Sequence, residues 1–570
     1  MRRRIAGLTL ALMPMVLGAQ QRDTTISRQG LPRDIAREAA DLFNRTAALR
    51  RTGRTDIEAG LDITGDVAVI NGPLTIAGHV TGRVLAINSD VILRPGARIE
   101  GDLLVVGGVV EGRNIGYVGG EIRVYRQSMS YVQEGERISP AAATSDSDDV
   151  WWRRWGRRPE SGGSKIQIAS AGAYNRVEGL PINLGPQIYR NYDSASVRLD
   201  AYAVVRTGTS FRADDNDIGH NLRGELRLGR DHGLLFAARA YDVVDPVESW
   251  GLSNLEAGLS AGLFKRDYRD YFRRHGGSVQ AGIFSPHNAT LTASYADERW
   301  DPRATADPWT LFNGDDPWRE NPAMDQGHFH LFNTTLRLDS RSDESNPWSG
   351  WYVLADYERG TGRIDVLAPA AVARTLPIDR RVSYDRGFVD LRRYNRVSRG
   401  AQLNVRVVAG GWLGGDPLPL ERRLSVDGTG ALPGFEFRSG RAGTTDVSTC
   451  SSGLVPPGYP AQCDRIALAQ VEYRSSLHVD LFDWSSDDWG RPQFSRGGAW
   501  VLFADAGRGW LVGDIANPMT YDRGSLPDFS TFRTDAGFGL DFDAIGVFVA
   551  KALSTPGQPG RVFVRLHHRF

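Results

Sequence analysis

Alternation of apolar and charged residues is the dominant pattern in this chain from residue 165 to its end. In 197–205, for example, the odd-numbered residues are apolar, whereas Arg198 and Asp200 stand between them. Successive side chains of a β-strand point to opposite faces, so each such segment has one apolar and one charged face. A soluble sandwich buries the apolar face in its core, whereas a membrane barrel turns it to lipid and sends the charges into a wet lumen.

The number and spacing of these segments favour the barrel. We count about sixteen of them, a typical number for an outer-membrane barrel. Long polar connections at 299–327, 360–382 and 427–465 are typical of surface loops, whereas short turns suit the opposite end of the barrel. We therefore expect an all-β protein whose main body, residues 165–570, is a transmembrane antiparallel β-barrel of about sixteen strands.

The last ten residues read as the strand that closes this barrel. One face carries apolar side chains and the other carries basic ones. We expect Phe570 to act as a C-terminal outer-membrane signal. We expect this strand to pair with the segment near 166–176. Val562, Val564, Leu566 and Phe570 form the predicted lipid face, and Arg561, Arg565, His567 and Arg569 form the other.

The N-terminus predicts export. Residues 2–4 are arginines, 5–17 form a short apolar run, and 17–19 resemble a cleavage site, so we assign 1–19 to a signal peptide. No other stretch reaches the 18 apolar residues of a membrane-spanning helix. The 68 basic and 68 acidic residues balance, which gives no bias toward nucleic acid. We expect a bacterial outer-membrane protein.

Three further segments are expected before the barrel. Residues 26–56 contain an amphipathic helix, 57–126 a β-solenoid in the periplasm, and 127–164 a disordered linker. The solenoid prediction rests on short β-branched pieces separated by glycines about every six residues. Residues 65–108 resemble the bactofilin, or polymer-forming, family, and that resemblance implies a solenoid able to self-assemble.

The two cysteines lie close together in a loop rich in Gly, Pro and Ser. Cys450 and Cys463 are thirteen residues apart, and a disulfide is the default for such a pair in an exported chain. A metal site at this loop is not expected, because no histidine stands nearby with ligand spacing.

An ordered series of motifs resembles the bacterial surface-antigen barrels of the BamA type. The matching pieces span about 400 residues, counted from the first motif to the chain end, and precede or enter strands of the expected barrel. They are "AYNRVEGLPINLGPQ" (173–187, resembling the first barrel strand), "DSRSDESNPWSGWYV" (339–353), "LPLERRLSVDGTGALPGFEFRSG" (418–440), "GAWVLFADAGRGW" (498–510) and "FRTDAGFGLDF" (532–542).

The resemblance implies a long loop folded into the lumen, where an Arg-Gly-aromatic motif reaches acidic groups on the wall. This chain departs from the motif, because Pro433 stands at the Arg position before Gly434 and Phe435. The expected wall acids are Glu472 and Asp505. We hypothesise that Arg438 pairs with them, since an unpaired charge there is costly; alternatively, the two acids are ordinary lumen residues.

No enzyme motif is present, and no cofactor is expected. The sequence lacks a zinc-protease His-Glu-x-x-His, a nucleophile elbow and a phosphate-binding glycine loop. His328 and His330 share one strand face, which suits a metal pair, but a solvated lumen face is the favoured interpretation.

Two functions remain open. The barrel resemblance implies assembly, insertion or translocation of envelope components, with outer-membrane lipid, the barrel assembly machinery and envelope protein clients as partners. The alternative is a structural outer-membrane anchor or passive pore whose solenoid self-assembles or binds periplasmic partners. The family's usual POTRA modules are not apparent, because one helix and a solenoid precede the barrel.

Overall fold

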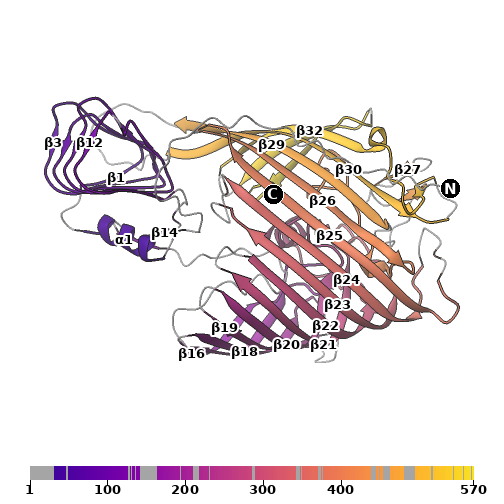
Figure 1. Ribbon diagram of the computed structural model, residues 1–570. Helices are drawn as coiled ribbons and strands as arrows, with labels where there is room; N and C mark the ends of the chain where they lie inside the picture. Colours follow the sequence, from indigo (N-terminus) through magenta and orange to yellow (C-terminus); the bar gives the residue numbers. More distant parts are fainter. Residues whose placement is uncertain are drawn as a thin grey trace, which may run out of the picture. The chain divides into compact units, whose positions relative to one another are not determined.

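The computed structural model divides the chain into two compact units, residues 1–142 and 143–570 (Figure 1). It describes residues 31, 33–45, 49–113, 115–125, 129, 131–134, 137–140, 163–192, 194–208, 217–229, 232–285, 289–341, 347, 349–369, 374, 376–398, 400–437, 445–447, 450–452, 463–480, 495–514, 518–542, 545–555, 557–566 and 568–570. The predicted signal peptide, 1–19, lies outside these residues.

The first unit is a β-solenoid with three parallel sheets. Val67 pairs with Val84 and Leu103 with Ile122, so one coil takes 17 to 19 residues. The first sheet holds β1 (Leu49–Thr52), β4 (Val67–Ile70), β7 (Val84–Ile87), β10 (Leu103–Val106) and β13 (Ile122–Tyr125). The second holds β2 (Thr55–Ile57), β5 (Leu74–Ile76), β8 (Val91–Leu93) and β11 (Val110–Glu111), and the third holds β3 (Asp62–Ile63), β6 (His79–Val80), β9 (Arg98–Ile99) and β12 (Tyr117–Val118).

Stacked aliphatic side chains fill the solenoid, and glycines allow its coils to approach at the corners. Val67, Val84 and Leu103 lie one above another and are fully buried. At one corner a Cβ on Gly82 would lie 2.3 Å from the Gly65 carbonyl carbon, so only glycine fits there. The glycine punctuation in the sequence therefore has a direct steric cause.

A helix and a hairpin cover the outer side of the first sheet. The helix α1 (Arg33–Phe43) and the hairpin β14 (Tyr131–Glu134) and β15 (Arg137–Pro140) pack on it with their apolar side chains. Two predicted boundaries were wrong: the solenoid begins at β1, not at residue 57, and part of the expected 127–164 linker is this hairpin. Both errors arise because β1 and the two hairpin strands have only four residues each and gain their stability from packing.

The second unit is one large antiparallel sheet of sixteen strands in sequence order, and a two-residue strand, β31 (Thr520–Tyr521), adds a parallel pair. The strands are β16 (Gly163–Ser170), β17 (Pro181–Asn191), β18 (Ala195–Arg206), β19 (Ile218–Leu228), β20 (Gly233–Pro246), β21 (Tyr271–Ser285), β22 (Ala289–Pro302), β23 (Gln326–Asp339), β24 (Gly350–Val366), β25 (Arg381–Arg396), β26 (Ala401–Gly415), β29 (Arg465–Asp480), β30 (Ser495–Val512), β32 (Arg533–Asp541), β33 (Gly546–Ala552) and β34 (Arg561–Arg565).

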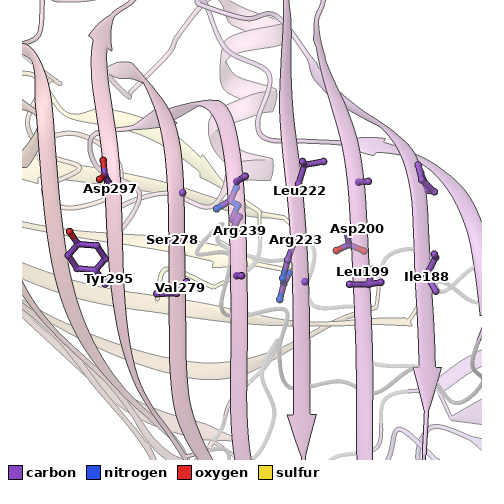
Figure 2. A pocket seen from close by; sticks show the side chains of 16 residues that line it. Ile188, Leu199, Asp200, Leu222, Arg223, Arg239, Ser278, Val279, Tyr295 and Asp297 are labelled. Atoms are coloured by element: carbon purple, nitrogen blue, oxygen red, sulfur yellow. The ribbon is translucent and has the colours of Figure 1, made fainter.

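The sheet curls into a barrel with an apolar outside (Figure 1). On β18 the exposed side chains include Leu199 and Ala201, whereas Asp200 and Tyr202 between them are buried. A hollow of about 730 Å³ lies on the wall from β17 to β22. Figure 2 shows Ile188, Leu199, Val279 and Tyr295 among its lining residues. The predicted all-β class and strand number are confirmed.

Long connections gather at one end of the barrel because the strands alternate in direction. They include 247–270, 303–325, 367–380 and 416–464. The strands run further than expected at both ends of the predicted loops 299–327 and 360–382. The third loop, predicted at 427–465, begins eleven residues earlier because β26 ends at Gly415. The first of these contains a second helix, α2 (Asn254–Phe264), which the sequence analysis did not predict. Short two-residue strands β27 (Thr445–Asp446) and β28 (Ser451–Ser452) and the 3-10 helices η2 (Leu420–Arg422) and η3 (Phe529–Thr531) lie in other connections. Among the described residues, no helix is long and apolar enough to cross a bilayer.

Two predictions about the ends of the sheet were wrong. The last strand ends at Arg565, the residues beyond it leave the sheet, and no pairing joins it to the segment near 166–176 within the described residues. The motif at 173–187 forms the turn after β16 and part of β17, so it is not the first strand. Val562 and Val564 do face outward, but the Phe570 ring lies 6.5 Å from the buried Tyr394 ring of β25 instead of on the lipid face.

Glu38 of α1 and Arg123 of β13 form an ion pair at 2.5 and 3.0 Å. The hydrogen bonds from Arg123 hold the pKa of Glu38 below its ordinary value. A carboxylate of this kind stabilises the fold above its unfolded pKa, and that stability is lost as the pH falls through the lowered value. We expect Glu38→Gln to reduce hydrogen-exchange protection of α1 severalfold or less at pH 7, because an exposed pair contributes about 1 kcal/mol at most.

The difference between Glu38→Gln and the wild type should disappear once the pH has fallen below the lowered pKa of Glu38. Glu58→Gln is the matched control, since Glu58 is an exposed acid of the same solenoid. Equal protection of α1 in wild type and Glu38→Gln at pH 7 would contradict the prediction.

Candidate functional site

The first and last strands of the sheet form a seam without backbone pairing. β16 and β34 stand at opposite ends of the strand order, and no pairing joins them within the described part of the chain. The strands near the seam are short: β16 has 8 residues and β34 has 5, compared with 18 in β30. Ile166 on one edge is 78% exposed and Val562 on the other is 70% exposed. Both edges therefore present free backbone groups.

The helix α2 is tied to the last strand from inside the barrel. Ser253 caps the helix, and Glu256 completes a capping box with it. The Glu256 carboxylate also accepts hydrogen bonds from Arg565 Nε at 2.5 Å and from the Leu566 backbone N–H at 3.0 Å. Both charged side chains are buried. One glutamate thus fixes the start of α2 and the end of β34.

The opposite side of α2 meets the connection that follows the first strand. A Cβ on Gly258 would lie 3.0 Å from the Tyr174 backbone nitrogen, which shows how closely the helix approaches 171–180. In that connection the buried Arg176 pairs with Asp267 at 3.0 Å and with Asp270 at 3.1 Å. The helix therefore braces the seam, because it contacts the chain on both sides of it.

The C-terminal tail is held inside the lumen by charged contacts. Arg569 is buried, pairs with Asp505 of β30, and lies 3.7 Å from the centre of the Phe503 ring. His568 Nδ1 lies 3.1 Å from Asp541 Oδ2, which Arg474 also contacts at 2.7 Å. These partners explain why the chain leaves the sheet after Arg565: the basic residues of the predicted strand find acids within the barrel.

The long connection 416–464 folds inward and packs on the wall. Leu432 and Phe435 join a buried cluster with wall residues such as Leu468. The Gly434 N–H donates to Asp535 Oδ2 at 2.6 Å, and a Cβ there would lie 2.7 Å from the Asp535 Cβ. Asp535 is the register partner of Asp505. The loop backbone thus donates to one of two adjacent wall acids, and Arg569 forms an ion pair with the other.

The predicted site residues come together only in part. Pro433, Gly434 and Phe435 are buried in the inward loop, and Glu472 and Asp505 are buried on the wall. Arg438 lies outside the described residues. Among those described, Glu472 contacts Arg474 at 3.2 Å and Asn404 at 3.4 Å, and Asp505 contacts Arg569.

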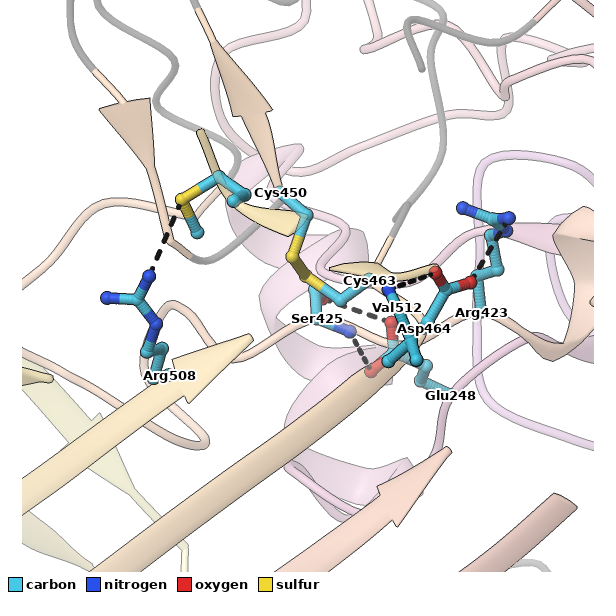
Figure 3. The surroundings of a disulfide bond; sticks show 9 residues. Glu248, Arg423, Ser425, Cys450, Cys463, Asp464, Arg508 and Val512 are labelled. Carbon is cyan, nitrogen blue, oxygen red and sulfur yellow. Dashed lines mark hydrogen bonds and ion pairs between the residues drawn. A yellow bond between two sulfur atoms is a disulfide. The ribbon is translucent and has the colours of Figure 1, made fainter. Parts of the chain in front are cut away.

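A disulfide fastens the base of the inward loop (Figure 3). Cys450 and Cys463 are bonded, with Cα atoms 5.1 Å apart, and both are buried. Next to them Asp464 pairs with Arg423 at 3.2 Å. The ion pair connects the returning end of the loop to its first part. The Val512 N–H of β30 donates to Asp464 Oδ2 at 3.0 Å and so connects that end to the wall.

Sequence reasoning missed α2, Glu256 and Arg569. The Ser253-x-x-Glu256 spacing before an apolar run is a capping-box signature and was available to predict the helix. Nothing local indicates that Arg569 turns inward, because the alternation continues through the chain end. Its partner lies 64 residues away in the sequence.

The fold and the site define an all-β protein. It is a sixteen-stranded antiparallel barrel whose lumen holds a helix, an inward loop and the C-terminal tail, and a β-solenoid precedes it in the sequence. Within the described residues its first and last strands are not paired with each other. No family model and no curated protein matches the chain. BamA from Haemophilus ducreyi lacking POTRA domains 1–3 is similar over 76% of this chain and 80% of that chain, with 13% identity and a TM-score of 0.38.

Two further solved structures are similar to the chain. CdiB from Escherichia coli matches over 72% of this chain and 63% of its own, which is less than two thirds of its length, with 12% identity and a TM-score of 0.30. The siderophore receptor PirA from Pseudomonas aeruginosa matches over 72% and 68%, with 10% identity and a TM-score of 0.31. Because these TM-scores are low, the fold assignment rests on the strand order and register of the chain itself.

Glu256→Gln tests the brace. This change keeps a hydrogen-bonding side chain at the cap but removes the charge that faces Arg565, so β34 should open more often. We expect faster hydrogen exchange in β34 and in 171–180. Ser253→Ala is the control: it costs the cap about 1 kcal/mol but leaves the ion pair. The brace is refuted if both variants change the exchange of β34 equally.

Arg569→Ala tests the anchoring of the C-terminal tail. Asp505 would lose its ion-pair partner while buried, so the unfolding temperature in SDS should fall, at a cost of up to about 3 kcal/mol. Arg438→Ala should lower the unfolding temperature less, because Asp505 already has Arg569 as its partner. A double variant with Asp505→Asn should recover part of the loss. A larger loss in Arg438→Ala than in Arg569→Ala would favour the hypothesis that Arg438 is the partner of the wall acids.

Proposed function

We propose that this protein is an outer-membrane barrel that assists insertion or translocation of envelope proteins through its β16–β34 seam. The observation that carries the proposal is the pair of unpaired edge strands. An exposed edge is a template on which another chain adds a strand through backbone hydrogen bonds. The apolar outside and charged inside of the wall support placement in the outer membrane.

Three features of the seam suit a temporary template. The edge strands are short, so few hydrogen bonds have to form or break. The brace from α2 acts from the lumen side through Glu256 and Arg565, which leaves the backbone edges free. Phe563 of β34 stacks on Phe548 of β33 with ring centres 5.2 Å apart, which keeps the last strand in its register. This function requires no catalytic step.

A passive pore has less support, because the described lumen is filled. The inward loop packs Leu424, Leu432 and Phe435 against the wall. The helix α2 and the C-terminal tail occupy further space through their contacts with Arg565 and Asp505. Solute flux through such a barrel requires these elements to move together.

Cysteine crosslinking in proteoliposomes tests the seam. The two native cysteines are bonded to each other, so a single added cysteine reports alone. We expect Ile168→Cys on β16 to crosslink to the terminal strand of a urea-denatured client barrel during its folding. Leu403→Cys is the matched control, because it faces outward in the middle of the wall on β26.

The wild-type protein should also speed client folding in the same vesicles. Equal crosslinking at both cysteines, or no acceleration of folding, would contradict the insertion function. Flux of a small solute without client folding would instead support the pore.

A second candidate function is self-assembly through the solenoid. Its last coil leaves strands β11, β12 and β13 at the ends of their sheet orders, and Ile115 and Tyr117 there are exposed. Stacking of a further coil on such an end extends a solenoid. Concentration-dependent sedimentation of the full chain in detergent, abolished by Tyr117→Lys, would support this function.

A further inference from the structure

An aspartate and two histidines meet on adjacent strands far from the seam. Asp297 lies on β22, and His328 and His330 lie on β23 with one residue between them. Asp297 is the register partner of His330. The two histidine rings are 5.0 Å apart, and His328 Nε2 contacts Asp297 Oδ1. Alternation on one strand and pairing with its neighbour thus bring three ligand-type side chains to one spot.

These side chains face outward, which corrects the predicted lumen position of the histidines. Asp297 and His328 are about half exposed, at 53% and 51% of their side chains, whereas Glu298 and Phe329 beside them in sequence are fully buried. On the inner face Phe329 stacks on Trp300 with ring centres 3.9 Å apart. Asp297 also borders the outward hollow of Figure 2.

The arrangement matches the needs of a zinc-type ion. One ligand atom from each side chain lies within 4.8 Å of the others. His330 Nδ1 and Asp297 Oδ2 are 3.4 Å apart, close to the roughly 3.3 Å that two ligands span on tetrahedral zinc with bonds of about 2.05 Å. We propose that Asp297, His328 and His330 form a binding site for a divalent transition metal such as Zn²⁺, with the fourth position open to the outside.

The neighbouring groups permit a cation. Tyr295 Oη lies 3.0 Å from His330 Nδ1, and the metal takes the place of that hydrogen bond. The register partners of His328 on the flanking strands are Arg299 and Arg363. Asp365 lies 3.7 Å from Arg299 and 3.9 Å from Arg363, so its carboxylate offsets positive charge at this rim.

Zinc titration of the full-length protein tests the site. The protein is purified without a histidine tag, stripped with EDTA and titrated with Zn²⁺ against a chromophoric chelator in detergent. Wild type should bind one more equivalent of Zn²⁺ than His328→Ala, His330→Ala or Asp297→Asn, or bind it at least tenfold more tightly. His220→Ala is the matched control, since His220 is another exposed histidine of the wall, on β19.

Folding of each variant is checked by its heat-dependent mobility in SDS, because these side chains lie on the outer surface and their loss should not unfold the barrel. Unchanged zinc binding in all three variants would overturn the proposal. An equal loss in His220→Ala would also overturn it, because it would show nonspecific binding to surface histidines. X-ray absorption of the zinc-loaded protein should show two imidazole ligands.

Discussion

Buried pairs of arginine with acids inside the barrel decide how its last strand ends. A charge removed from water without a partner is costly, so Arg565 and Arg569 require acids within reach. Glu256 and Asp505 supply them from α2 and from β30. Because these acids lie in the lumen, the chain turns inward after Arg565 instead of continuing along the sheet. The short last strand and the unpaired seam follow from that turn.

Two of these contacts hold the inward loop and the chain end against the same part of the wall. Pro433 of the loop carries neither a charge nor a backbone N–H. The Gly434 N–H and the Arg569 guanidinium take the two adjacent acids, Asp535 and Asp505. A backbone donor from the loop and a cation from the chain end therefore contact adjacent acids of the same wall. Anchoring of the loop and anchoring of the C-terminus are consequently coupled.

Much of the fold was predictable, because odd and even residues of a strand point to opposite faces and the alternation of apolar and polar residues therefore marks a strand. Val197–Val205 and Leu403–Val407 form strands as expected, and the strand number is confirmed. The alternation does not show, however, which of the two strand faces points into the barrel lumen. At His328 and His330 the lumen is lined by Phe329 and Leu331, so the polar face turns outward. The contacts of α2 and of the C-terminal tail connect residues hundreds or tens of positions apart, which local patterns do not encode.

The brace acts on the side chains of Glu256 and Arg565, whereas strand addition at the edges uses backbone groups. The seam can therefore be held and still accept a strand, as the proposed function requires. Backbone hydrogen bonds between β16 and β34 would oppose every incoming strand, whereas the Glu256–Arg565 contact opposes only the movement of β34 from α2. A ligand shifts a conformational equilibrium only by its differential affinity for the two states. Under the proposed function, a client strand that pairs more extensively with the moved edge than with the braced edge favours the open state. Such pairing breaks no contact within the wall.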